Sequence, residues 1–115
     1  MNERDDLVYI KHINDNLTAI FTFLQTTDTK EKFTKNFLIQ NAIMYQLMIM
    51  GEAVKNLSSE FRKNHIYIPW SDITGLRDKL IHHYFGTDIN ILWDTLQKDL
   101  PELRKNIAEI VKNNQ

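Results

Sequence analysis

The chain has 115 residues, of which 43% are hydrophobic and 25% charged, and it contains three glycines, two prolines and no cysteine. This composition favours a single helix-rich domain over residues 1–115, and the lack of cysteine excludes disulfides, thiolate metal sites and a cysteine nucleophile. The formal net charge is -1, so no global basic field attracts nucleic acid, and we expect no DNA binding of the histone type.

The N-terminus and the most apolar segment give no sign of export or membrane insertion. Residues 1–6 are mainly acidic, whereas a signal peptide begins with a basic stretch followed by an apolar one. The segment from Leu38 to Val54 is interrupted by polar residues such as Gln40 and Glu52, and it falls short of the roughly 18 apolar residues that a membrane span needs. We therefore expect a cytoplasmic protein in which this segment is a buried helix.

Hydrophobic periodicity predicts two long helices in the first half of the chain. Apolar residues recur at steps of three and four from Asp5 to Leu24, which is the stripe of an amphipathic helix. Asp28 and Glu31 form a plausible capping pair for a second helix that runs to about Ser58. Gly51 in this second helix would let a neighbouring helix come close.

The second half is expected to contain shorter helices. A short helical segment starts near Ser58, and His65 to Pro69 is expected to be an extended connection, because no second strand pattern could pair with it. Ser71 or Asp72 is expected to cap a helix through Leu80, and Asp88 to cap the next one.

Apolar residues near the C-terminus form an almost heptad seam, made of Ile89, Leu92, Leu96, Leu100, Leu103, Ile107 and Ile110. Pro101 interrupts it and predicts a kink or a new helix capped by Asp99. The predicted fold class is an all-α bundle of four or five helices. The seam and the second helix together offer more apolar surface than one small bundle would cover, which predicts a homodimer.

Residues 75–86 hold the densest group of chemically functional side chains, namely Arg77, Asp78, His82 and Tyr84. Cleavage of a phosphodiester without a metal needs a group that exchanges a proton near neutral pH and a cation that stabilises the growing negative charge, and His82 and Arg77 could supply them. On a regular helix they lie about 140° apart. Either the helix loosens near His82 or a second chain completes the site. Asp78, one turn before His82, could hold the imidazole in one tautomer.

The same residues also fit an ordinary solvated helix face, with His82 and His83 near the carbonyl end. His12 and His65 are isolated and are expected at the surface. A metal site is not expected, because the adjacent His82 and His83 point apart. Glu52 is expected on the narrow polar side of its helix. The alternative is a buried carboxylate that reaches an arginine, which would need this pairing and would mark a site.

The chain resembles the HepT-like branch of the HEPN superfamily, small all-α toxins of prokaryotic toxin–antitoxin pairs. The family motif is an arginine, a polar residue, three further residues, a histidine, any residue and a tyrosine. Arg77, Asp78, His82 and Tyr84 fill its slots, although asparagine is also common at the polar one. The resemblance covers nearly the whole chain and extends to residues 51–53, Trp70, Ile73, Asp88, Trp93 and the turn at residues 100–103.

The resemblance implies a homodimeric endoribonuclease that uses neither metal nor cofactor, with two motif segments facing one cleft. Arg77 would steady the scissile phosphate of RNA, and His82 would transfer the proton. In similar proteins a minimal nucleotidyltransferase of the MntA type silences the toxin by adding AMP to the tyrosine that corresponds to Tyr84. An alternative of another class is a non-catalytic helical subunit that docks on a nucleotidyltransferase and presents its substrate.

Overall fold

The computed structural model describes residues 3–82 and 88–115, without the side chains of residues 3, 4 and 82. In this part of the chain there are seven helices and no strand: α1 (Glu3–Leu24), α2 (Lys30–Lys35), α3 (Phe37–Lys55), α4 (Ser59–Asn64), α5 (Trp70–His82), α6 (Ile89–Lys98) and α7 (Leu100–Asn113). The all-α fold class is confirmed. There are more helices than the four or five expected, because two of the predicted segments are interrupted.

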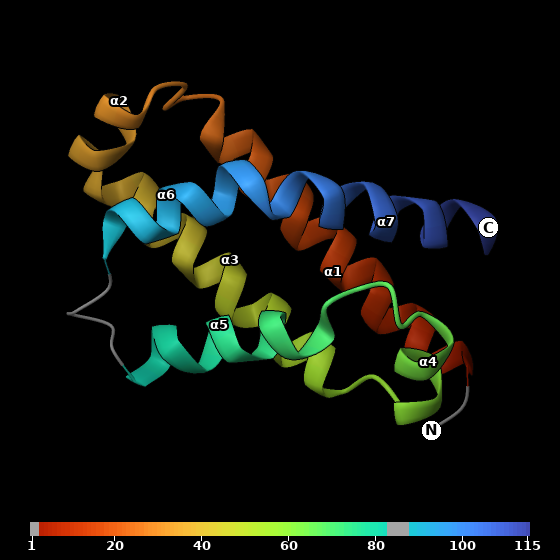
Figure 1. The fold of residues 1–115 in the computed structure, drawn as a ribbon. Helices are drawn as coiled ribbons and strands as arrows, with labels where there is room; N and C mark the ends of the chain where they lie inside the picture. The colour runs from red at the N-terminus through yellow and green to blue at the C-terminus, as the bar shows by residue number, and fades with distance from the viewer. Residues whose placement is uncertain (1–2, 83–87) are drawn as a thin grey trace.

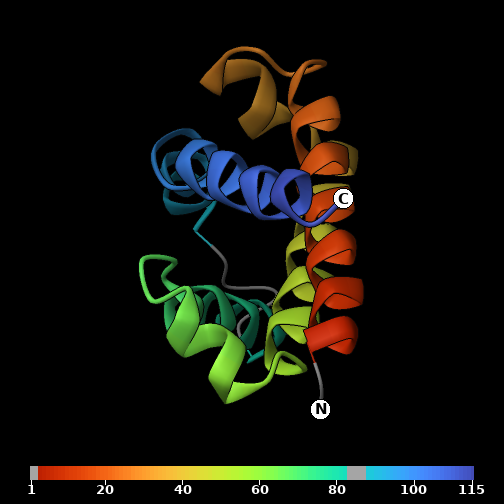
Figure 2. The same ribbon diagram turned by 90° about the vertical axis from the view of Figure 1, so that its right-hand side faces the viewer.

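The helices form two layers. α1 and α3 pack against each other as an antiparallel pair, α5 packs on α3, and α7 packs on α1 (Figure 1). Figure 2 shows α5 and α7 on the same side of the α1–α3 pair, with α2 at one end of the molecule and α4 at the other. The molecule measures 43 × 28 × 20 Å.

The apolar stripe of α1 is buried as its periodicity predicted. Ile10, Ile13, Leu17 and Ile20 are all 0% exposed, because steps of three and four residues keep them on the face that contacts α3 and α7. α1 begins slightly before the predicted start and ends at the predicted residue, Leu24. α1 therefore supports α7 in the second layer, whereas α5 packs on α3.

The predicted continuous helix from Asp28 to Ser58 is wrong, because Asn36 divides it into α2 and α3. Asn36 caps α3 with its side-chain oxygen, which accepts a hydrogen bond from the Ile39 amide at 3.0 Å. The buried Gln40 side chain donates to the carbonyls of Phe33 (2.9 Å) and Thr34 (3.1 Å). These bonds satisfy backbone groups that a continuous helix would have paired within itself. The cap of α2 is Thr29 and not Asp28.

The connection between α4 and α5 contains no strand, as predicted, but the expected extended conformation is wrong. Residues 65–67 form a turn, in which the Ile68 amide donates to the His65 carbonyl at 3.1 Å. α5 starts at Trp70, one residue before the expected caps, and the Pro69 carbonyl accepts from the amides of Asp72 (3.1 Å) and Ile73 (3.2 Å). The Trp70 indole donates to the carbonyl of Arg62 at 3.2 Å. The buried indole thus ties the first turn of α5 to the end of α4.

The predicted start of α6 is confirmed, since the Asp88 side chain accepts from the amide of Asn90 at 2.9 Å. A new helix also starts around Pro101, but Asp99 makes no capping bond with its side chain. The seam was expected to leave apolar surface for a second chain. That expectation is wrong, because every seam residue from Leu92 to Ile110 is at most 4% exposed within one protomer.

By length and composition alone, α3 is the helix of the described part that could cross a membrane. This differs from the expectation that the segment is too short of apolar residues for a membrane span. α3 is also the core helix of the bundle. Eight of its residues are buried, and it packs against α1, α2 and α5. The packing explains its apolar character.

Candidate functional site: the Arg77 ion-pair cluster

α3 and α5 cross in close contact where Gly51 meets Arg77. A Cβ atom added to Gly51 would overlap the Cβ of Arg77 and would lie 2.7 Å from its Cγ. Only a residue without a side chain can occupy this position at this helix separation. The prediction that Gly51 allows close approach of another helix is confirmed, and the neighbour is the helix that carries the Arg77 motif.

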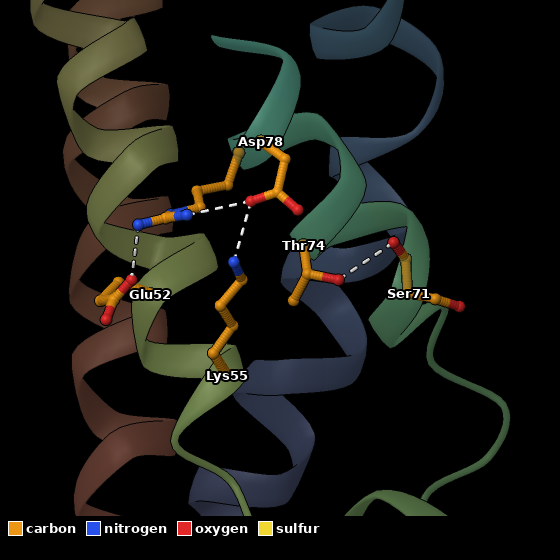
Figure 3. A network of polar contacts seen from close by, with 6 residues as sticks. Glu52, Lys55, Ser71, Thr74 and Asp78 are labelled. Carbon is orange, nitrogen blue, oxygen red and sulfur yellow. Dashed lines mark hydrogen bonds and ion pairs between the residues drawn. The ribbon is translucent and has the colours of Figure 1, made fainter. Parts of the chain in front are cut away.

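This crossing places Arg77 among charged groups of both helices. Its Nη2 lies 2.9 Å from Oε2 of Glu52 on α3, and its Nη1 lies 2.9 Å from Oδ1 of Asp78 on α5. Lys55 of α3 contacts the same Asp78 oxygen with its Nζ at 2.8 Å. Figure 3 shows Glu52 and Lys55 on one helix and Asp78 on the other, joined by this network. We call these four residues the Arg77 cluster.

The cluster holds the guanidinium in a defined place. The Arg77 side chain is 24% exposed, and its Nε is buried without a hydrogen-bond partner among the described residues. Each terminal nitrogen contacts one carboxylate oxygen and carries two N–H groups, so the guanidinium retains donors for an anion. The arrangement can bind a phosphate through an oriented cation.

The charges of the cluster affect Asp78 most clearly. The hydrogen bond from Lys55, followed by that from Arg77, lowers the pKa of Asp78 below its ordinary value. Asp78 is therefore a carboxylate near neutral pH. Its contacts with Lys55 and Arg77 were not predicted from the sequence.

The other two motif residues are described in part or not at all. His82 is the last residue of α5, which is one α-helix from Trp70 onward, and the described structure shows no loosening of the helix before it. The His82 side chain, together with His83 and Tyr84, lies outside the described residues. The predicted contact between Asp78 and His82 is thus also outside them.

Glu52 and Lys55 complete the cluster from α3. The interpretation of Glu52 as a carboxylate paired with an arginine fits the structure, although its side chain is 56% exposed and not buried. Lys55 was missed by the sequence analysis. The available signal was its spacing of three residues from Glu52, which places both on one face of a helix.

The two isolated histidines are not among the ion-pair partners of this cluster. His12 is exposed, as expected. His65 is half-buried: its ring packs on Phe61 with 4.3 Å between centroids, and Nδ1 lies 3.0 Å from the Phe61 carbonyl oxygen. Within the described ranges, no group of His, Cys, Asp and Glu side chains could hold a metal ion.

The family of the chain follows from comparison with known proteins. Residues 13–110 match the family model described as ribonuclease HepT-like. The chain belongs to the HepT-like ribonuclease family. The resemblance noted from the motif is confirmed, and so is the enzyme class of endoribonuclease.

Curated relatives of this HepT-like protein agree with the family. A candidate RNase of Caldanaerobacter subterraneus subsp. tengcongensis is 49% identical over 71% of this chain and 73% of the relative. A candidate RNase of Methanocaldococcus jannaschii is 39% identical over 98% of this chain and 93% of the relative. A second protein of that organism, named both a gamma-glutamylcyclotransferase and a candidate RNase, is 36% identical over 95% of this chain, which spans 49% of that relative. No solved structure matches the chain.

Proposed function

We propose that this HepT-like protein cleaves RNA without a metal ion, with Arg77 as the phosphate-binding cation and His82 as the proton-transfer group. The observation that carries the proposal is the oriented and partly exposed guanidinium of Arg77, held by Glu52 and Asp78 at 2.9 Å each. A cation fixed before the reaction stabilises developing charge without reorganising at the moment of cleavage.

The proposed reaction is a transesterification at one phosphate. His82 removes the proton of the 2′-hydroxyl, whose oxygen attacks the adjacent phosphorus while the bond to the 5′-oxygen breaks. The 5′-oxygen leaves with a proton taken from water, His82 releases its proton to the solvent, and the other fragment carries a 2′,3′-cyclic phosphate. Arg77 donates hydrogen bonds to the non-bridging oxygens, on which negative charge grows. Asp78 supports the reaction by holding Arg77.

We further propose that the working form is a homodimer, with one cleft built from two protomers. α3 carries an exposed apolar stripe of Leu38 (77%), Tyr45 (61%) and Ile49 (37%), and Glu52 of the cluster is one turn beyond it. Steps of seven, four and three residues place all four on one helix face. A second copy that covers the stripe would therefore bring its own motif segment close to Arg77.

The proposed biological role is that of a toxin in a toxin–antitoxin pair in the cytoplasm. Its antitoxin would be an MntA-type nucleotidyltransferase that adds AMP to Tyr84. Tyr84 is two residues beyond His82, so the modification would put bulk and negative charge where the RNA phosphate must bind.

A cleavage assay with purified protein tests this function. We expect wild-type protein to cut RNA in EDTA, His82→Ala to be slower by about 10²–10⁴, and Arg77→Ala by about 10²–10³. His83→Ala is the matched control and should stay close to wild type. Equal losses at His82 and His83 would assign the wrong histidine, and loss of activity in EDTA would reject the metal-free mechanism. A wild-type chain without any activity would favour the substrate-presenting subunit.

A further inference from the structure

Glu52 contacts Arg77 directly, but it has no step in the proposed reaction. It reaches Arg77 from another helix, and it contacts Nη2 while Asp78 contacts Nη1. Two carboxylates that bind opposite terminal nitrogens restrict both the position and the plane of a guanidinium, which neither of them could do alone. The contact of Gly51 with the Arg77 Cβ and Cγ restricts the start of the same side chain.

We propose that Glu52 is a positioning residue for Arg77, which orients the guanidinium for the scissile phosphate and at the same time weakens the binding of RNA. This role rests on the ribonuclease function proposed above. The unpartnered Nε of Arg77 supports it, because within the described part no third hydrogen bond fixes that edge of the guanidinium. The orientation of the group therefore depends on its two carboxylates.

A purely structural role for Glu52 explains the geometry less well. Its side chain is 56% exposed, and ion pairs exposed to solvent contribute little to the stability of a fold. The pair is therefore a minor term in the stability of the bundle. Its larger effect is on the orientation of a cation that is itself only 24% exposed.

Glu52 orients Arg77 favourably, but its negative charge acts unfavourably on the binding of RNA. Glu52 and Asp78 balance Arg77 and Lys55, so the four formal charges sum to zero. A half-exposed carboxylate next to the phosphate site repels the substrate. Its removal should help binding and harm the chemical step, which is a signature that a folding defect would not produce.

The test is the cleavage kinetics of Glu52→Gln, which removes the charge and keeps the shape. We expect kcat to fall by about 10-fold to 100-fold through misorientation of Arg77, while KM stays equal or decreases. Glu52→Asp, which restores a carboxylate on a shorter side chain, should recover part of kcat. Glu60→Gln on α4 makes the same charge change at an exposed position and should match wild type. Thermal melting of all three variants should stay within a few degrees of wild type.

The dependence on Arg77 is tested with the double variant. In an Arg77→Ala background, Glu52→Gln should cause no further loss of kcat, because there is no guanidinium left to orient. An unchanged or higher kcat in the single variant would overturn the positioning role, and so would an additive loss in the double variant. If Arg77→Ala itself cleaves like wild type, the proposed function fails. If only Glu52→Gln does, the function stands and the role of Glu52 is rejected.

Discussion

The backbone of Gly51 on α3 lies directly against the side-chain stem of Arg77 on α5. An added Cβ would overlap the Arg77 Cβ and lie 2.7 Å from Cγ. Arg77 can therefore hold its position only because residue 51 on the other helix is a glycine. Because Glu52 and Lys55 follow on α3 within the next turn, the same crossing brings the whole Arg77 cluster together.

Gly51→Ala should destabilise the protein and impair cleavage. Overpacking costs about 1–3 kcal/mol, and the overlap with the Cβ and Cγ of Arg77 favours the upper part of this range, above the gain of about 1 kcal/mol in helix propensity. The helices must also separate, so we expect RNA cleavage to fall by about 10-fold to 100-fold. Gly75→Ala is the matched control on α5, since a Cβ there meets nothing within 4 Å. It should leave cleavage unchanged and raise stability by up to about 1 kcal/mol. Equal melting shifts for the two variants would contradict the packing argument.

Lys55→Met should raise the pKa of Asp78. The hydrogen bond from Lys55 is the largest cause of the lowered pKa, and Arg77 contributes the next one. Because the folded-state pKa is below the unfolded value, the pair contributes to stability above the unfolded pKa, and this contribution is lost as the pH falls through the folded pKa. An NMR titration of the Asp78 side-chain carboxyl carbon measures the shift. Lys63→Met, at an exposed position of α4, is the control that should leave the titration unchanged.

The proposed dimer should depend on the stripe of α3. In a symmetric dimer, Tyr45→Glu would bury one added charge from each protomer in the interface. The dimer Kd should therefore rise at least about 10-fold while the fold is kept. Ile91 on α6 is exposed to a similar extent, 64% against 61% for Tyr45, and Ile91→Glu should remain dimeric. Light scattering at tens of micromolar separates the two. A wild-type monomer at that concentration would reject both the dimer and the shared cleft.

Tyr84→Phe should keep ribonuclease activity and lose control by the antitoxin. Only a hydroxyl is removed, and the proposed reaction does not use it. With the cognate nucleotidyltransferase, ATP and magnesium, wild-type protein should gain mass in AMP-sized steps and become inactive, whereas the variant should gain none and stay active. Intact-protein mass spectrometry beside the cleavage assay decides this. A modified Phe variant would place the acceptor elsewhere, and an unmodified but silenced one would point to inhibition by complex formation.

Several features of this protein could be predicted from the sequence alone, and most of them are local. The stripe of α1 follows from the period of 3.6 residues, the Asp88 cap from its side-chain type before an apolar run, and the family from the motif that begins at Arg77. The first two depend on residues within a few turns of one another, whereas the family resemblance is also carried by residues spread over nearly the whole chain.

Tertiary structure decided the rest. The break at Asn36 depends on Gln40 bonding to carbonyls across it, and the burial of the Leu92–Ile110 seam depends on the packing of α6 and α7 within one protomer. Above all, periodicity could place Glu52 on a polar face but could not select Arg77 as its partner. That pairing follows from a helix crossing at Gly51, and the distance between two helices is a property of their packing and not of either sequence pattern.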